Sequence, residues 1–388
     1  MESYYEQPFE YLKRKATGEK FEKEVYDNWY IARAFVLDKL EDVVFEVDSG
    51  EHLRVVVQGD SPLMLSVVRQ VALSAHYVNY DEENPVETKR KRTVITIVSQ
   101  NPKIMEELQK EEYLYNLPKY CKWSQNGIVH NADSYIDVEL EILKDCFEEE
   151  QSDVKVIREE EVETYYRLKP EQEVYRIDTR KAQYAGRMYD LGVLIDNLPA
   201  ENIHDAHRYA MALDVYQFRR LLEPLKELVN DEKWSKNQVK VKGGLSNVFC
   251  ADRFETIEKE VAKSKEKEIE NCREEAVKDG MRKADFWEKY NEALSKSEHS
   301  RWVAEKLIMG FSPLNNEERL LDESLAPYKK RRKEFRDSLK NDENKLAHID
   351  LCSNADLRRV NPDDMKYDSF LMLAIPKILE KIVKHDKK

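Results

Sequence analysis

The sequence lacks several features typical of membrane and secreted proteins. No run approaches the roughly 18 apolar residues that a membrane-spanning helix needs, and the first residues lack the basic and apolar regions of a signal peptide. The five cysteines are scattered and include no Cys-x-x-Cys pair, so neither a disulfide framework nor a zinc site is indicated. We therefore expect a cytoplasmic protein with reduced thiols, no bound metal and no membrane partner.

The chain also lacks a net positive charge. The chain holds 64 Lys and Arg against 77 Asp and Glu, which gives a formal net charge of −13. Binding to a nucleic-acid polymer requires a basic face, so we expect no such partner, although a local basic pocket for one small anion is compatible with the negative total. With 388 residues, 41% of them hydrophobic, the chain is long enough for two or three globular domains.

Three short segments predict a parallel α/β sheet. Residues 53–59 and 93–98 are β-branched runs, and residues 136–142 alternate apolar and polar side chains. Helical patterns separate them, and the strand–helix alternation is typical of a Rossmann-like layout. Residues 154–157 form a further strand-like run, within an acidic stretch that we interpret as a linker or a peripheral hairpin.

The dinucleotide-binding fingerprint of a Rossmann fold is degraded in this sequence. The motif needs three glycines, but the corresponding positions hold Gly59, Ser61 and Met64. Ser99 stands where an acidic residue would bind the ribose. We therefore predict a scaffold with no bound NAD and no other cofactor. Free N–H groups near Gly59 still favour a phosphate, although Asp60 would oppose it.

Residues 297–311 are the most informative segment. They predict a helix that ends at Gly310, with His299, Trp302 and Lys306 on one stripe and two glutamates beside it. One interpretation is structural, with Trp302 as a core anchor and the charged residues as a local ion pair. The other is a ligand pocket in which Trp302 stacks on a planar base while Arg301 and Lys306 meet phosphates.

The pattern Glu-His-x-Arg-Trp-x-x-Glu-Lys-Leu, closing on Gly-Phe, resembles the core motif of the ryanodine-receptor-type (RyR) repeat domain. It is most similar to prokaryotic versions that follow a Rossmann-like domain of the TrkA-N type. A Ser-Asn pair before a helix and the sequence 345–348, Lys-x-x-His, also match, although Ile349 replaces the proline that normally follows. The resemblance implies binding of a nucleotide or a nucleotide-derived signal, in a signalling or antiviral defence system.

The predicted fold is therefore a degenerate Rossmann-like parallel α/β domain followed by a mostly α, RyR-type helical domain. The predicted domains are an N-terminal helical extension (1–52), the Rossmann-like domain (53–150), a linker and helical connector (151–240) and the RyR-type domain (241–388). The predicted ligand-binding residues are Ser246, Asn247, Glu298, His299, Arg301, Trp302, Glu305, Lys306, Lys345 and His348. We assign no catalytic residue.

Two other functions remain open at this point. His299, Glu298 and Glu305 have the chemistry for general acid–base work, for instance in a nucleotide hydrolase. Against this, the sequence contains no nucleophile motif and no intact phosphate loop. The third possibility is a scaffold without a small ligand. We expect a nucleotide-derived small molecule as the main partner, with a protein partner or a second copy of the chain for the output.

Overall fold

The computed structural model describes residues 23–168, 249–271 and 283–362, with gaps at 48, 85, 87–89, 145–153 and 343–344, and a few single residues up to 379. Ser246 and Asn247 lie outside the described residues. The chain divides into two compact units, one of which combines Glu24–Leu168 with Lys296–Met365. That unit holds all the described strands, and it also contains residues 298–311 from the predicted helical domain.

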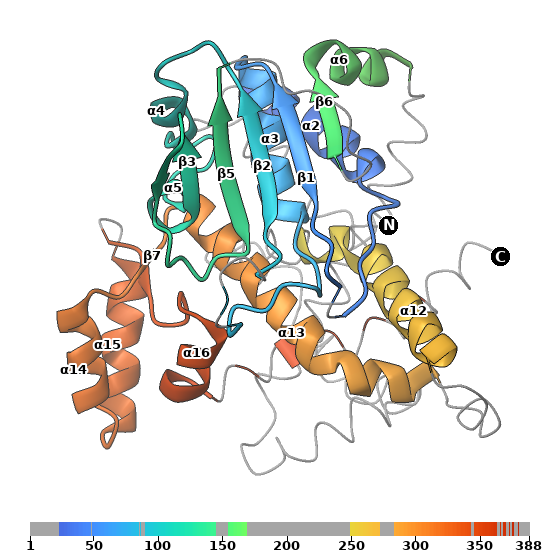
Figure 1. The fold of residues 1–388 in the computed structure, drawn as a ribbon. Helices are drawn as coiled ribbons and strands as arrows, with labels where there is room; N and C mark the ends of the chain where they lie inside the picture. Colours follow the sequence, from blue (N-terminus) through green and yellow to red (C-terminus); the bar gives the residue numbers. More distant parts are fainter. Residues whose placement is uncertain are drawn as a thin grey trace, which may run out of the picture. The chain divides into compact units, whose positions relative to one another are not determined.

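Six strands form one mainly parallel sheet in this unit (Figure 1). Their order is β4-β3-β5-β2-β1-β6, and among them only the β3–β4 pair is antiparallel. The strands are β1 (Arg54–Gln58), β2 (Thr93–Val98), β3 (Lys122–Gln125), β4 (Ile128–His130), β5 (Val138–Leu143) and β6 (Val154–Arg158). The predicted α/β fold with a parallel sheet is confirmed.

The middle of the sheet is buried on both faces, as parallel sheets require. Val55, Val56 and Val57 of β1 are fully buried, and Ile95 of β2 lies in register with Val55. The alternating pattern predicted for β5 is confirmed, since its residues are buried and half-buried in turn. These β-branched side chains fill the space between the covering helices, so the central strands form the core.

Helices surround the sheet and form the remaining described structure. In the same unit they include α2 (Lys23–Lys39), α3 (Pro62–Ser74), α4 (Ile104–Leu108), α5 (Leu117–Tyr120), α6 (Glu159–Leu168), α14 (Asn316–Ser324), α15 (Lys329–Asn341) and α16 (Asn354–Val360). The long helix α13 (Lys283–Ile308) enters this unit with its second half, whereas α12 (Phe254–Asn271) belongs to the other unit. None of the helices described here is long and apolar enough to cross a membrane.

Helix α3 shows how the local sequence sets the fold. Ser61 caps its N-terminus by accepting a hydrogen bond from the Met64 backbone N–H, and Pro62 occupies the first turn, where its missing N–H costs nothing. One run of its residues, including Val67, Val68 and Val71, is fully buried. The buried side of the helix therefore packs against the sheet, and the short turn between β1 and α3 sets where the helix starts.

The strand β6 changes the predicted topology. Residues 154–157 were predicted as a strand-like run within a linker or a peripheral hairpin, but they form a strand of the main sheet, since β6 pairs in parallel with β1 and Val156 lies opposite Val56. Strand β1 thus lies between β2 and β6, while the chain has to pass through β3, β4 and β5 before it reaches β6. This reversal of strand order creates a topological switch point at the carboxyl ends of β1 and β6.

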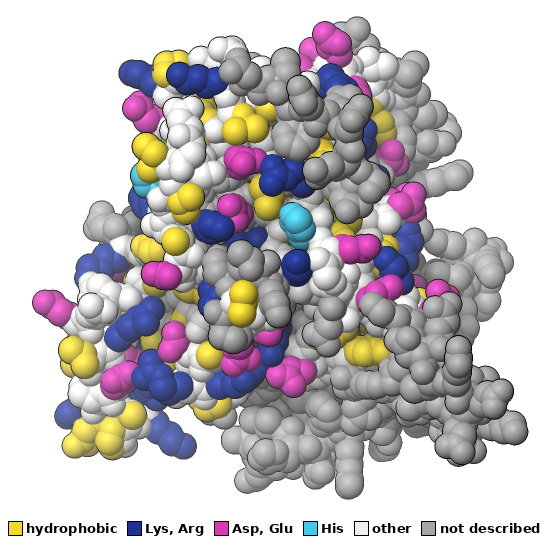
Figure 2. Space-filling view, viewed as in Figure 1, with side chains coloured by type: hydrophobic (Ala, Val, Ile, Leu, Met, Phe, Trp, Pro, Cys, Tyr) yellow, Lys and Arg dark blue, Asp and Glu magenta, His cyan; other side chains and the backbone are white. Residues whose placement is uncertain are grey.

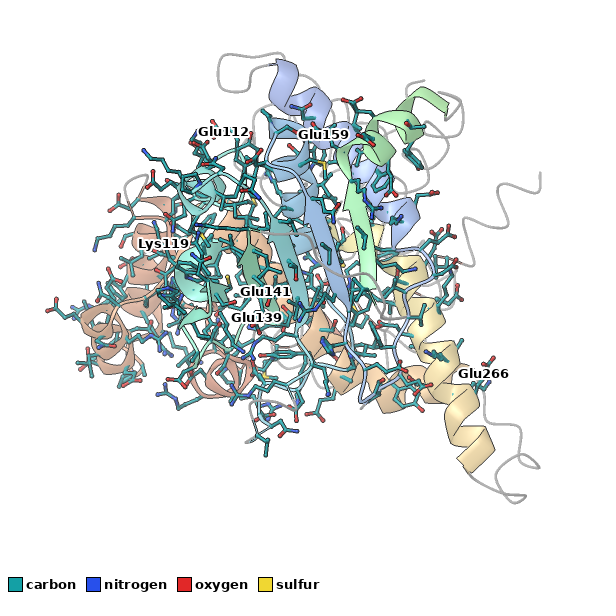
Figure 3. All side chains as sticks on the ribbon, turned by 45° about the horizontal axis from the view of Figure 1, so that its top comes forward. Glu112, Lys119, Glu139, Glu141, Glu159 and Glu266 are labelled. Atoms are coloured by element: carbon teal, nitrogen blue, oxygen red, sulfur yellow. The ribbon has the colours of Figure 1, made fainter. Side chains whose placement is uncertain are left out.

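A polar seam crosses one face of the sheet. Arg54 on β1 donates to Glu141 on β5 at 2.5 Å, and Thr96 on β2, which lies between these strands, donates to the same carboxylate at 2.8 Å. Lys122 on β3 pairs with Glu139 at 3.0 Å. Figure 3 labels both glutamates along β5. These contacts connect β1, β2 and β3 to the two glutamates of β5.

Residues 312–348 form a small helical hairpin on a base of two short strands. Strand β7 (Ser312–Pro313) pairs in parallel with β8 (Ala347–His348). Asn315 and Glu318 form a reciprocal capping box that starts α14. Leu314, Leu339 and Ala347 make a local core, against which Phe335 and Ile349 pack. Ile349 therefore has a packing role in this hairpin.

Candidate functional site

The candidate site begins at the C-terminal end of α13. Gly310 has a φ of +91°, and the helix ends in two capping hydrogen bonds, from Phe311 N to Lys306 O at 2.9 Å and from Gly310 N to Leu307 O at 3.1 Å. The predicted glycine cap is confirmed. Asn116 adds to this end, since its side chain donates to the Gly310 and Phe311 carbonyls at 2.8 and 3.0 Å.

Arg301 is the centre of a buried ion-pair network. The side chain is 1% exposed, and it donates to Glu298 through Nε and Nη2, with the shortest distance 2.7 Å. Its Nη1 donates to Glu305 at 2.7 Å. All three side-chain nitrogens thus point at carboxylates. The structure gives Arg301 a structural role, and the expectation that it meets a phosphate gains no support.

Glu305 connects this network to Lys306. Its second oxygen accepts from Lys306 Nζ at 2.7 Å. Burial opposes ionisation of Glu305, but Lys306 and Arg301 together hold the pKa of this carboxyl below its ordinary value. An ionised, fully paired glutamate is a weak proton acceptor. Glu305 therefore positions the Lys306 ammonium and is poorly suited to act as a general base.

Trp302 stands where several polar groups meet. Lys306 Nζ lies 5.6 Å from the centre of the indole ring, and His299 stacks beside the ring with centroids 6.1 Å apart. His348 approaches with its ring edge at 5.1 Å. The indole is half-buried, and within the described residues its Nε1 has no hydrogen-bond acceptor. Trp302 therefore offers a free donor beside an ammonium group.

His348 supplies a second free donor. Its Nδ1 accepts from the backbone N–H of Asp350 at 3.2 Å, so the proton of the neutral ring sits on Nε2. Among the parts of the chain that the structure describes, no acceptor bonds to this Nε2. Burial, with Lys340, Lys306 and Arg336 nearby, lowers the pKa of His348 to about 3. The ring is therefore a neutral donor at physiological pH.

The structure brings only some of the predicted residues together. Trp302, Lys306 and His348 form one cluster, which we name the indole–imidazole cluster. His299 touches it through the Trp302 ring, but its own Nε2 lies 3.0 Å from the carbonyl of buried Cys352. Lys345 is exposed and pairs with Glu318 at 2.7 Å, so its ammonium faces α14. Its predicted role in ligand binding stays a prediction.

Two residues near the cluster were missed by the sequence analysis. Lys340 and Arg336 of α15 are among the cations that lower the pKa of His348. No spacing in the sequence links position 340 to position 306, because β7, α14 and most of α15 lie between them. The positive field at His348 is therefore a tertiary feature.

The switch point of the sheet includes the second predicted anion site, where free N–H groups near Gly59 favour a phosphate. Gly59 has a φ of +132°, and Ser61 Oγ donates to Glu159 Oε1 at 2.5 Å. The other oxygen of Glu159 would lie 3.6 Å from a Cβ placed on Gly59. Figure 3 labels Glu159 at this end of the sheet. A carboxylate of the chain itself therefore occupies the place where a Rossmann fold binds a pyrophosphate.

Asp60 strengthens this conclusion. Its carboxylate accepts a hydrogen bond from Ser99 Oγ at 2.8 Å. Ser99 is the residue that stands where the dinucleotide fingerprint has its ribose-binding acid. Two carboxylates at the carboxyl end of β1 repel a phosphate. Within the described residues, no group of three or more His, Cys, Asp or Glu side chains is arranged to hold a metal ion. His204 and His207, which lie three apart in the sequence, fall outside the described residues.

The chemistry of the indole–imidazole cluster is that of anion binding. It combines one ammonium with two neutral N–H donors that lack acceptors among the described residues, and charge-assisted hydrogen bonds to anions are the strongest of this kind. The hydrolytic alternative is weaker, because Glu298 and Glu305 are both held by Arg301. Comparison with known protein families, curated proteins and solved structures finds no match for this chain.

Proposed function

We propose that this chain is a non-catalytic ligand sensor that binds a small nucleotide-derived anion at the indole–imidazole cluster. The observation that carries the proposal is the pair of donors, Trp302 Nε1 and His348 Nε2, beside the Lys306 ammonium. Neither donor is among the fully buried unpaired atoms of the described residues, so water can reach both, and a bound anion would replace that water with charge-assisted hydrogen bonds. The resemblance to RyR-type modules supports a nucleotide as the source of that anion.

The ligand's phosphate would meet Lys306 Nζ and the two N–H donors. Lys306 Nζ uses one of its three protons for Glu305, which leaves two for the ligand. Glu305 itself is held by Arg301, so the Lys306 side chain stays in place before the ligand arrives. Such preorganisation lowers the entropic cost of binding. In this proposal Glu298 holds Arg301, and Arg301 holds Glu305 in position for Lys306. Neither Arg301 nor Glu298 touches the ligand.

The proposal is tested by thermal unfolding against mono-, di- and cyclic nucleotides, with native mass spectrometry to detect stoichiometric binding. A ligand at 100 times its dissociation constant adds about 2.7 kcal/mol to the free energy of unfolding. Loss of one charge-assisted hydrogen bond in Lys306→Gln is expected to weaken binding roughly 10- to 100-fold. His348→Phe keeps a ring but removes the donor, and should weaken binding less.

Lys110→Gln is the matched control, because it removes the same charge from an exposed lysine that pairs with Glu107. It should bind the nucleotide like the wild type. Equal weakening in Lys110→Gln and Lys306→Gln would show a general charge effect and would refute the site. Release of a hydrolysed product would favour the enzyme, and the absence of any shift over the whole panel would favour the scaffold.

A further inference from the structure

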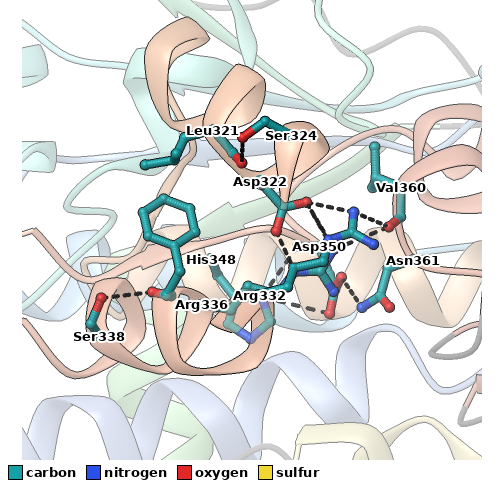
Figure 4. Close-up of polar contacts among 11 residues, drawn as sticks. Leu321, Asp322, Ser324, Arg332, Arg336, Ser338, His348, Asp350, Val360 and Asn361 are labelled. Carbon is teal, nitrogen blue, oxygen red and sulfur yellow. Dashed lines mark hydrogen bonds and ion pairs between the residues drawn. The ribbon is translucent and has the colours of Figure 1, made fainter. Parts of the chain in front are cut away.

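The free end of the α14–α15 hairpin is a distinct surface, away from the residues that hold the hairpin in place. Asp322 of α14 is 1% exposed and pairs with two arginines of α15, Arg332 at 2.6 Å and Arg336 at 2.7 Å. Both guanidinium groups also donate to the Val360 carbonyl, as Figure 4 shows. The hairpin is thus clamped on its inner side, which leaves its outer side and its end to face solvent.

Large apolar side chains are exposed on this hairpin. Leu320, Leu321 and Tyr328 are 67%, 47% and 57% exposed. In the described part of the chain, only Val86, Ile128 and Val129 are comparable. Ala326 and Pro327, in the turn between the two helices, are exposed as well. Figure 2 shows hydrophobic side chains gathered at the lower left, with Lys and Arg side chains beside them.

A run of cations follows the turn directly. Residues 329–333 are all Lys or Arg, although the chain as a whole carries a net charge of −13. Arg332 turns inward to Asp322, while the others are exposed. Lys330 has a side chain that is 91% exposed and lies 3.9 Å from an exposed glutamate, Glu334. A contact of that kind neutralises little charge. The end of the hairpin is therefore locally basic.

We propose that this end of the hairpin docks on an anionic lipid bilayer. We define the docking tip by the residues Leu320, Leu321, Tyr328, Lys329, Lys330, Arg331 and Lys333. Basic side chains meet anionic headgroups, and an exposed aromatic with neighbouring leucines enters the interfacial layer. A nucleic acid would use the cations and Tyr328 but would gain nothing from Leu320 and Leu321. The combination of both features favours lipid.

The prediction that the chain has no membrane partner rests on the lack of a spanning segment and of a signal peptide. Neither observation bears on a local basic and apolar tip. Arg331 lies 5.8 Å from the centre of the Tyr328 ring, so the aromatic and cationic groups form one surface. Tyrosine suits such an interface because its ring is apolar and its hydroxyl is polar. The docking tip shares no residue with the indole–imidazole cluster.

The test is co-sedimentation of the full chain with vesicles of phosphatidylcholine alone and of phosphatidylcholine mixed with phosphatidylglycerol. We expect binding to the mixed vesicles only, and weaker binding as salt rises. Each basic residue near an anionic surface contributes roughly fivefold, so the double variant Lys329→Gln/Lys330→Gln should bind about 25-fold more weakly. Tyr328→Ser should weaken binding without any change in charge.

The matched control is Lys103→Gln/Lys144→Gln, which removes the same charge from two exposed lysines of the sheet-bearing unit. It should sediment like the wild type. Equal losses in the two double variants would overturn the proposal, as would an absence of wild-type binding to the mixed vesicles at low salt. Binding to nucleic acid that depends on Lys329 and Lys330, without vesicle binding, would overturn it in favour of a nucleic-acid partner.

Discussion

The guanidinium of Arg301 forms a bidentate ion pair with the carboxylate of Glu298, one turn earlier on α13. Its Nε lies 2.9 Å from one oxygen and its Nη2 lies 2.7 Å from the other. Both side chains are almost fully buried, at 1% and 2% exposure. Removing one partner of such a pair leaves an uncompensated charge in the interior. Arg301→Ala should therefore lower the free energy of unfolding by about 3–5 kcal/mol, measured by urea denaturation.

The double variant Glu298→Leu/Arg301→Met provides the control for this first prediction. It removes both charges and keeps the volume, and Glu305 retains Lys306 as its partner. We expect it to recover much of the lost stability, because paired apolar replacements of buried ion pairs are often tolerated. A stable, wild-type-like Arg301→Ala would contradict the buried network and would return Arg301 to the list of ligand contacts.

The second prediction concerns pH and His348. The pKa of this imidazole falls from 6.5 in the unfolded chain to about 3 in the folded one. Below pH 6.5 the unfolded chain therefore binds more protons, so stability is lost as pH falls from 6.5 toward 3. This single group should account for a loss of about 2 kcal/mol between pH 7 and pH 5.

Urea unfolding of the wild type and of His348→Gln over that pH range measures the effect. Asp322 and Glu305, whose pKa values are also lowered, destabilise both proteins on acidification and cancel in the difference. The stability difference between the two proteins should shrink by about 2 kcal/mol from pH 7 to pH 5. Parallel pH curves would mean that folding does not change the pKa of His348, and would contradict its burial beside these cations.

The third prediction concerns Gly310, whose Cα faces the ring of Tyr115. A Cβ at Gly310 would lie 2.3 Å from Tyr115 Cε1, and the φ of +91° strains any other residue. Gly310→Ala should cost about 2 kcal/mol or more in unfolding free energy. Adding Tyr115→Ala should relieve the clash but not the strain, so the two substitutions should be less than additive. Strict additivity would contradict the close approach.

The fourth prediction concerns Glu159 at the switch point. Its carboxylate accepts from Ser61 at the N-terminus of α3, where negative charge is favoured. Glu159→Gln should destabilise the chain by about 0.5–1 kcal/mol at low salt, and by less at high salt. Glu163→Gln is the control, because Glu163 lies on the same helix α6 and is exposed. An equal effect of both variants would show that the loss is not specific to Ser61.

Much of the sheet could be predicted because the relevant signals are local. Runs of β-branched residues identified β1, β2 and β5. The hairpin of β3 and β4 was missed, although Asn126 and Gly127 both have positive φ and form the Asn-Gly turn that favours such hairpins. The position of β6 could not be predicted, since pairing with β1 depends on contacts about 100 residues apart in the sequence.

The candidate site shows the same division. The helical stripe of His299, Trp302 and Lys306 followed from residue spacing, and the structure keeps these three near one another. Spacing did not reveal that Arg301 faces inward, because a helix pattern with charges on every side leaves its buried face undetermined. The approach of His348 to Trp302 also depends on the parallel pairing of β7 with β8, which no local pattern encodes.

Glu159 limits what a free anion can bind at the carboxyl end of β1. Because the carboxylate is part of the chain, it competes for Ser61 at a fixed effective concentration. For tethered groups this effective concentration is commonly about millimolar. A free phosphate would first have to displace it and then tolerate Asp60 close by. The carboxyl end of β1 is therefore self-saturated: the chain itself supplies the anion that Ser61 binds, and a free anion could bind there only in competition with a tethered one.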